Sequence, residues 1–282
     1  MHTDVYRLIT DRIVTLLDAG TVPWQKPWNA ATALPRNLVT GKAYRGINVF
    51  LLGTQHYTSP FWVTFQQCKA RRGSVKRGEK STPVVFWKVS EYVTKDEDTG
   101  AEDIRKGFLL RYYNVFNVEQ CQRLTYPSIA PMPNDIEPLV ACEHIVGNMP
   151  HAPLIRHGEP QAYYSPAADM INMPQRHLFH SSEEYYSTLF HEIVHSSGHA
   201  ARLNRRTLTD LCPFGSTNYS AEELCAEMGA AYLCGIAGIA NRTLDNSAAY
   251  IQGWLAKLKR DPKVLVQAAA HAQKAVDYIT GA

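Results

Sequence analysis

The chain has 282 residues, enough for one large domain or two of ordinary size. It is 45% hydrophobic, but no run of about 18 apolar residues is present, which excludes a membrane-spanning helix. Residues 1–130 hold 18 Lys and Arg against 11 Asp and Glu, whereas residues 131–282 hold 11 against 15. This asymmetry favours two domains, the first of which faces an anionic partner.

The first predicted element is an amphipathic helix at the N-terminus. Apolar residues recur at helical spacing from Val5 to Leu17, and Gly20 is the expected end. Charged residues interrupt this stretch, so it is not a signal peptide. The six cysteines form no CxxC pair, which indicates free thiols in a reducing compartment. The sequence therefore predicts a cytoplasmic protein.

Short strands, turns and one or two helices are predicted between residues 24 and 120. Residues 83–89 and 107–118 are rich in aromatic and β-branched side chains, which is typical of strands. The charged residues 91–103 between them are predicted to form a solvated hairpin tip. Residues 61–72 have a more helical pattern, with Gly73 as the expected end.

A change in composition marks a candidate domain boundary. Four prolines lie between residues 123 and 138, so residues 126–137 are the predicted linker. The expected fold class is α+β, with a mixed α/β domain over residues 1–125 and a second domain over residues 138–282. The elements predicted for the second domain are a helix at 138–149, two short strands within 162–174 that meet at a turn at Pro166, a helix ending near Ser197, a helix at 220–236 and two helices after 246.

Residues 190–199, FHEIVHSSGH, contain an HExxH motif. A helix that ends at Gly198 places His191 and His195 one turn apart on the same face. Two imidazoles at this spacing can bind one zinc ion, and Glu192 beside them can act as general base on a water. The surrounding residues are apolar, which argues against two simply solvated histidines. We therefore expect a metal centre here.

A catalytic zinc site needs a third protein ligand. The longer motif with a third histidine is excluded because Ala201 stands at that position. Downstream, Glu223 and Glu227 lie one helical turn apart. Glu223 is the candidate ligand and Glu227 the candidate hydrogen-bond partner for the far nitrogen of a ligand histidine. Ser220 and Glu223 also fit a capping box, so a helix cap is the alternative role of Glu223. Glu222 is the alternative ligand.

Three protein ligands leave one coordination position for water, which is typical of a catalytic zinc. Peptide hydrolysis fits such a site best, with Zn²⁺ as the expected metal and another divalent cation such as Mn²⁺ as the alternative. An edge strand within 162–174 would hold an extended peptide, and residues 168–174 alternate suitably for this role before Pro174 ends the strand. A purely structural hairpin fits equally well. Tyr219 or Tyr164 would stabilise an oxyanion, and His199 is expected to line the site or to cap the helix.

The first domain combines aromatic and basic side chains. Four of the five tryptophans fall within the first 87 residues, and residues 69–80 hold six basic residues and one acid. Aromatic rings that stack bases, with cations that follow phosphates, are typical of single-strand binding. Core tryptophans and a solvated basic loop are the alternative interpretation. The candidate DNA contacts are Trp24, Lys26, Trp28, Lys42, Tyr44, Arg45, Lys69, Arg71, Arg72, Lys76, Arg77 and Lys80.

Several stretches together resemble the ArdC-type antirestriction proteins. In the first half these are WQKPWN, PRNLVTGKAYRGINVFLL, FWVTFQQ, RRGSVKRGEKSTPVVFW and GFLLRYYNVFNVEQC. In the second half they are DMINMP, HEIVHSSGH, RLNR and YSAEELCAEMGAAYL. The resemblance covers nearly the whole chain in the right order.

This resemblance implies an N-terminal single-stranded-DNA-binding domain and a C-terminal zincin-like metallopeptidase domain. Family members are carried on plasmids and other mobile elements and protect incoming DNA from host restriction. Carried onto this sequence, the metal ligands would be His191, His195 and Glu223, and the base would be Glu192. The expected partners are single-stranded DNA and an unidentified protein substrate, with no membrane. The competing hypothesis is a non-enzymatic DNA-binding protein whose metal site is structural.

Overall fold

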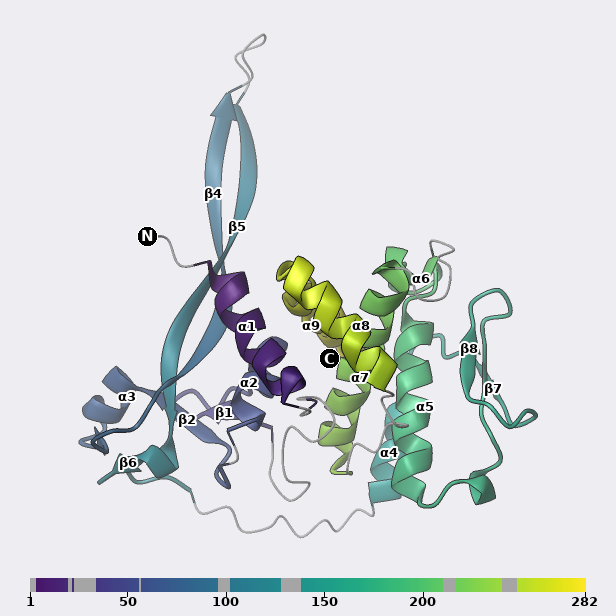
Figure 1. The fold of residues 1–282 in the computed structure, drawn as a ribbon, viewed down its shortest axis with the longest axis horizontal. Helices are drawn as coiled ribbons and strands as arrows, with labels where there is room; N and C mark the ends of the chain where they lie inside the picture. The colour runs from purple at the N-terminus through teal and green to yellow at the C-terminus, as the bar shows by residue number, and fades with distance from the viewer. Residues whose placement is uncertain are drawn as a thin grey trace.

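The computed structural model describes residues 4–19, 22, 34–55, 57–95, 102–127, 138–209, 217–239 and 248–282. It contains two parts that follow each other along the chain (Figure 1). The first part consists of helices α1 (Val5–Asp18), α2 (Ile47–Gly53) and α3 (Phe65–Ala70), strands β1 (Arg36–Asn37), β2 (Phe61–Thr64), β3 (Ser74–Val75), β4 (Thr82–Lys95), β5 (Glu102–Asn117) and β6 (Cys121–Gln122), and the short 3₁₀ turn Val118–Gln120.

The second part is mainly helical. Its elements are helices α4 (Pro138–Gly147), α5 (Ser182–Ser197), α6 (Arg206–Thr209), α7 (Thr217–Ala237), α8 (Ala248–Arg260) and α9 (Lys263–Thr280), strands β7 (Leu154–Arg156), β8 (Tyr163–Ser165) and β9 (Met170–Asn172), and the 3₁₀ turn Arg176–Leu178. The helices and the strand pair predicted for this region are all present. Among the described residues, no helix combines the length and apolarity required to cross a membrane.

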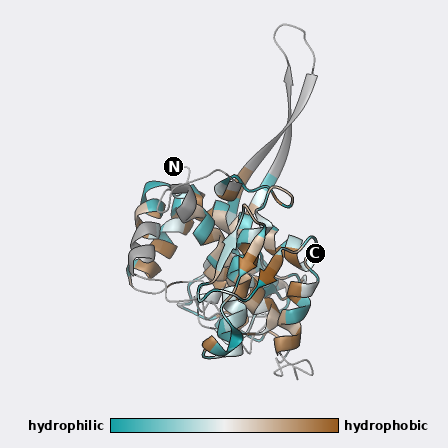
Figure 2. Cartoon of the chain, turned by 90° about the vertical axis from the view of Figure 1, so that its right-hand side faces the viewer, coloured by the Kyte–Doolittle hydropathy of each residue, from teal (hydrophilic) through white to brown (hydrophobic). Residues whose placement is uncertain are grey.

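The sheet of the first part has the strand order β1-β2-β5-β4. Strands β4 and β5 form an antiparallel hairpin that pairs continuously from Thr82 opposite Val115 to Lys95 opposite Glu102. Both views show this hairpin leaving the body of the molecule (Figures 1 and 2). Near its base, the Asn48 side chain bonds to the N–H and the C=O of Val85 at 2.7 and 2.8 Å. This amide covers the open edge of β4, where unpaired backbone groups would otherwise be buried.

Two sequence predictions for the first part need correction. Residues 61–64 are strand β2 rather than helix, because Trp62 and Val63 fill the core on opposite faces of the sheet. The helix that follows is only the short α3. The charged segment predicted as a hairpin tip instead belongs largely to the strands, which run to Lys95 and resume at Glu102. The tip itself lies outside the described residues.

Helix α7 is the central element of the second part and packs against both α5 and α9. From Leu224 to Cys234 every residue is buried, and Ala226, Met228 and Leu233 have no exposed surface. A helix that is apolar on all sides requires neighbours on all sides. Gly229 permits the contact with α5, since a Cβ at this position would lie 2.7 Å from a methyl carbon of Val194.

The two parts share one apolar core. Ile9 and Ile13 of α1 are fully buried in the same cluster as Trp254 of α8 and Leu265 of α9. Phe50 of α2 stacks on Tyr232 of α7, with ring centroids 4.9 Å apart and an interplanar angle of 16°. The predicted linker residues 128–137 lie outside the described residues, so the proposed boundary at 126–137 stays a prediction.

Replacing Gly229 with Ala tests the close contact between α5 and α7. The added methyl group would collide with the β-branched Val194, which has little rotamer freedom in a helix. We expect the free energy of unfolding to fall by about 1–3 kcal/mol. The matched control is Gly147→Ala in α4, where a Cβ meets nothing within 4 Å. This control should be neutral or stabilising by up to about 1 kcal/mol. Urea denaturation measures both, and equal effects would contradict the proposed contact.

Candidate metal centre and nucleic-acid interface

Helix α5 carries both histidines of the HExxH motif. It begins after Ser181, whose hydroxyl accepts from the N–H of Glu184 at 3.2 Å. It ends at Gly198, whose N–H donates to the carbonyl of His195 at 2.9 Å. A Cβ on Gly198 would lie 2.8 Å from the guanidinium of Arg205, so glycine leaves room for this side chain.

Helix α7 presents the acidic residues opposite this motif. It begins at Thr217, so Glu223 lies in the second turn and not at a helix cap. The predicted Ser220–Glu223 capping box is therefore wrong.

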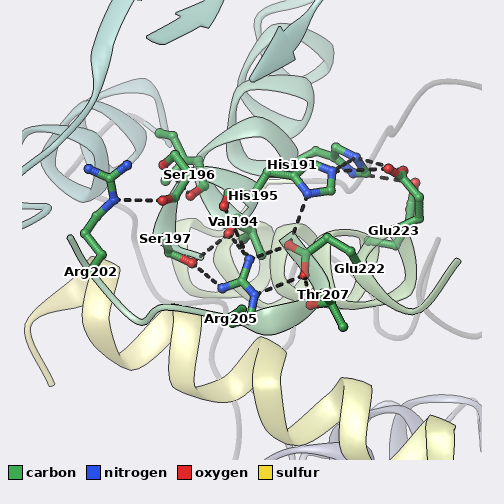
Figure 3. Close-up of polar contacts among 12 residues, drawn as sticks. His191, Val194, His195, Ser196, Ser197, Arg202, Arg205, Thr207, Glu222 and Glu223 are labelled. Carbon is green, nitrogen blue, oxygen red and sulfur yellow. Dashed lines mark hydrogen bonds and ion pairs between the residues drawn. The ribbon is translucent and has the colours of Figure 1, made fainter. Parts of the chain in front are cut away.

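Three side chains converge between the two helices. His191 and His195 place their Nε2 atoms 3.1 Å apart, and each Nε2 lies 3.5 Å from an oxygen of Glu223. Two ligands about 2.0–2.1 Å from a tetrahedral ion are themselves about 3.3 Å apart, so this spacing fits one shared cation. Among the described residues, this is the group of histidine, cysteine and carboxylate side chains that meets the spacing of a metal site. Figure 3 shows His191 and Glu223 on the same side of the cluster.

The surrounding carboxylates make this position favourable for positive charge. Burial disfavours the protonated form of His191, but the hydrogen bond with Glu223 and the charges of Glu227 and Glu192 outweigh it and raise the pKa of His191 to about 10. The pKa of His195 is likewise raised, against its burial, by Glu223 and Glu222. The same negative potential would attract a divalent cation.

Glu222 contacts the Nδ1 side of the His195 ring, whereas Nε2 faces His191 and Glu223. Its Oε1 lies 3.2 Å from Nδ1 of His195. A carboxylate only accepts hydrogen bonds, so Nδ1 donates, and a neutral ring then keeps the lone pair on Nε2. Glu222, the alternative ligand, thus occupies an orienting position instead. A carboxylate that bonds the far nitrogen of a ligand histidine is therefore present, and at His195 it is Glu222.

Arg205 holds Glu222 in this position. Its guanidinium contacts both oxygens of Glu222 at 2.5 and 3.2 Å and donates to the hydroxyl of Ser197 and the carbonyl of Val194 (Figure 3). Thr207 donates a further hydrogen bond to Glu222. Burial alone would raise the pKa of Glu222, but His195 and Arg205 hold it well below its usual range. Glu222 is therefore a carboxylate whose charge is balanced by a buried partner.

Glu192 and Glu227 are the other two acidic residues predicted for this site. Glu192 is 8% exposed and lies next to His191 on α5, and its role as base stays a prediction. Glu227 has Oε1 3.6 Å from Nδ1 of His191, which is an ion-pair distance rather than a hydrogen bond. Its expected role also stays a prediction.

Tyr164 and His199, two further predicted site residues, bond to the loop that follows α5 or to its neighbours. The hydroxyl of Tyr164 bonds to Asp169 and Arg202, so it is not available as an oxyanion donor. His199 accepts from the N–H of Ala201 at 3.2 Å. The side chain of Tyr219 lies outside the described residues.

The expected edge strand needs correction. The sheet has the order β7-β9-β8, so β9, which contains the alternating residues 170–172, is the central strand. Strand β7, which the sequence pattern did not reveal, pairs with it in parallel. An added peptide strand can therefore pair only along β8 or β7.

The predicted DNA contacts separate into four groups. Trp24, Lys26 and Trp28 lie outside the described residues. Tyr44 is 8% exposed and packs in a core cluster, so the prediction that its ring stacks a base is wrong. Arg45 pairs with Asp277 of α9. The other candidates have exposed side chains, namely Lys42, Lys69, Arg71, Arg72, Lys76, Arg77 and Lys80.

Six of these seven cations lie on one short stretch that runs from α3 through β3. Strand β3 pairs with β6, which anchors the stretch to the body of the domain. Arg72 and Gly78 have positive φ angles of 61° and 88° and turn the chain sharply on either side of β3. Lys76 is partly engaged, because its Nζ donates to the carbonyl of Glu119 at 2.8 Å. The stretch forms an exposed basic loop.

Comparison with known proteins covers both parts of the chain. A family model described as the N-terminal domain of anti-restriction factor ArdC matches residues 3–116. A second model, described as a zincin-like metallopeptidase, matches residues 143–271. The first half and the second half are therefore similar to two separately recognised domains.

Curated relatives extend over most of this chain. The DNA primase TraC of Escherichia coli is 37% identical over 96% of this chain, and a second protein of that name is 35% identical over 97%. This chain spans only 26% and 20% of their lengths. Protein y4eC of Sinorhizobium fredii is 33% identical over 98% of this chain and 92% of its own length.

Two crystal structures of the antirestriction ArdC protein from plasmid R388 share the fold. The metal-free structure has a TM-score of 0.75 and 38% identity, over 98% of this chain and 96% of its own. The Mn(II)-bound structure has a TM-score of 0.77 and 37% identity, over 99% and 97%. The chain belongs to the ArdC family of antirestriction proteins and consists of an ArdC N-terminal domain followed by a zincin-like metallopeptidase domain.

Proposed function

We propose that this protein binds single-stranded DNA with its first domain and hydrolyses a protein substrate at a divalent metal centre in its second domain. The observation that carries the proposal is the convergence of His191, His195 and Glu223, with Glu192 beside them. Protection of incoming mobile-element DNA from host restriction is the proposed biological outcome. It is supported by membership of a family that is named for antirestriction.

His191, His195 and Glu223 would hold the cation. Two imidazoles and one carboxylate suit Zn²⁺, and the Mn(II)-bound ArdC structure supports Mn²⁺ as an alternative. When bound, such a cation would polarise a substrate carbonyl and acidify a neighbouring water. Glu192 would accept the proton of that water and deliver it to the leaving amine. Glu222 and Arg205 would fix the ring of His195, as described above.

The basic loop and the net positive charge of residues 1–130 support a nucleic-acid partner. Cations that neutralise phosphates contribute affinity without reading the base sequence. No sequence preference is therefore expected from this loop. The alternative, a purely structural metal site, is disfavoured for two reasons. Three protein ligands would leave one coordination position for water, and a buried glutamate stands beside that position.

Replacing Glu192 with Gln separates catalysis from metal binding. The amide cannot accept the proton, so proteolysis should fall by at least about 100-fold. Metal content should remain that of the wild type, because no proposed ligand changes. His191→Ala combined with His195→Ala should remove the metal altogether. Elemental analysis and a proteolysis assay with a disordered protein substrate measure both. Retained proteolysis in the Glu192→Gln variant would contradict the assigned base.

Replacing Glu222 with Gln tests the orienting role. The change keeps the shape but removes the charge that balances Arg205 and favours the required tautomer of His195. We expect metal affinity to fall by about 10- to 100-fold, as judged by competition with a chromogenic chelator. Glu159→Gln, an exposed carboxylate beside β8, serves as the control. Unchanged affinity would show that His195 does not depend on Glu222.

Charge reversal tests the basic loop. Glutamate at Arg71, Arg72, Lys76 and Arg77 should weaken binding to a single-stranded oligonucleotide and flatten the salt dependence by about 0.7 for each lost phosphate contact. Fluorescence anisotropy at several salt concentrations measures both quantities. The control reverses four exposed cations of the second domain and so changes the net charge equally, at Arg156, Arg206, Arg260 and Lys274. If both variants behave alike, the loop is not the contact.

A further inference from the structure

One face of the β4–β5 hairpin carries an exposed group of aromatic and basic side chains. In the strand register, Phe86 lies opposite Arg111, and Lys88 lies opposite Leu109. Alternate residues of a strand, and residues directly opposite each other, share a face of the sheet. Tyr113 belongs to the same face, because its ring lies 5.7 Å from that of Phe86. These five residues are called the hairpin face below.

The three apolar side chains of the hairpin face are open to solvent. Phe86, Leu109 and Tyr113 are 43%, 47% and 37% exposed. On the other face, Val85 and Leu110 are buried in the main core, while Trp87 and Tyr112 are 45% and 39% exposed. Trp87 is partly covered there, because its ring lies 6.3 Å from that of Tyr6 of α1. Tyr113 interacts with the buried Tyr44, but more than a third of its surface, and more than two-fifths of that of Phe86 and Leu109, stays in contact with solvent.

The arrangement of the rings suits a flat aromatic ligand. Phe86 and Tyr113 meet at an interplanar angle of 57°, which keeps both rings in place while one face of each stays accessible. The exposed cations Lys88 and Arg111 lie beside them on the same strands. None of the described side chains on this face of β4 and β5 is acidic. The face is therefore complementary to an anion that carries aromatic groups.

We propose that the hairpin face is a stacking platform for single-stranded DNA, with bases on Phe86 and Tyr113 and phosphates beside Lys88 and Arg111. The proposal rests on the DNA-binding function proposed above and adds a second contact surface to the basic loop. Bases of a duplex are already stacked on one another, so only a single strand can offer them to these rings. A second copy of the chain fits less well, because a two-fold contact would bring like charges together.

The test measures binding of fluorescent oligo(dT) to the full chain. Phe86→Ala and Tyr113→Ala should each weaken binding roughly 5- to 150-fold, the range found for loss of one stacked base. Phe86→Tyr and Tyr113→Phe keep an aromatic ring and should bind like the wild type. Phe86→Leu keeps apolar area without a ring and should bind as weakly as Phe86→Ala. Leu178→Ala, at a 57% exposed position in the second domain, is the control.

Salt dependence separates the two kinds of contact. The aromatic variants should leave the slope of affinity against salt unchanged, whereas Lys88→Ala and Arg111→Ala should each flatten it by about 0.7. Phe86, Lys88 and Arg111 are exposed, so their variants should unfold at the wild-type temperature. Tyr113 also interacts with the buried Tyr44, so the binding of Tyr113→Ala is measured well below its own unfolding temperature.

Each alternative outcome has a distinct signature. If the wild type binds oligo(dT), the basic-loop variant binds weakly and the Phe86→Ala/Tyr113→Ala double variant binds normally, the platform is refuted and the DNA-binding function stands. If the wild type does not bind oligo(dT), the proposed function itself fails. If sedimentation shows that the double variant converts a wild-type dimer to a monomer, the face is an interface between copies, and the platform is again refuted.

Discussion

The close packing of α5 on α7 is the contact on which the candidate metal centre depends. Val194 lies against the backbone of Gly229, and the absence of a side chain there lets the two helices approach. His191 and His195 flank Val194 in the sequence of α5, and Glu223 lies on α7 within two turns of Gly229. This approach brings His191 and His195 of α5 to within 3.5 Å of the carboxylate oxygens of Glu223 on α7. The protein interior is close-packed and relaxes little, so a small change in this separation would be passed directly to the three ligand atoms.

A buried charge on the other side of His195 adds a second constraint. Arg205 is fixed by the Ser197 hydroxyl, the Val194 carbonyl and Glu222, all of which belong to α5 or α7. A buried ion pair contributes little net stability, because desolvation offsets its attraction, but it disfavours arrangements in which either charge is left unpaired. In the observed position of the two helices both charges are paired, and the same carboxylate contacts Nδ1 of His195. Gly198 contributes by leaving space for the guanidinium at the point where α5 ends.

The sequence predicted the parts of this arrangement that depend on local spacing, and missed those that depend on long-range contacts. The turn-to-turn spacing of His191 and His195, and the existence of most helices, follow from helical periodicity. Glu222 and Glu223 are adjacent in sequence, so only the packing of α7 decides which of them faces Nε2 and which faces Nδ1. Arg205 lies in a loop with no motif that connects it to Glu222.

In the first domain, Tyr44 matches the aromatic and basic pattern of a nucleic-acid contact, yet it is buried. Phe86 and Tyr113 match the pattern of ordinary strand residues, and only the folded arrangement of the hairpin shows that they share a face and are exposed.

The shared core gives these two surfaces a physical connection. The β4–β5 hairpin contributes Val85 and Leu110 to the cluster that also contains Phe50 of α2. Phe50 stacks on Tyr232 of α7, which lies five residues beyond Glu227 in the sequence. Helix α7 thus carries the acidic residues of the metal centre at one end and supports the first domain further along. Independent motion of the two domains would require this apolar contact to separate, which costs about 25 cal/mol for each Å² of apolar surface uncovered. The N-terminal and zincin-like domains are therefore joined through packed side chains of this core, in addition to the chain that connects them.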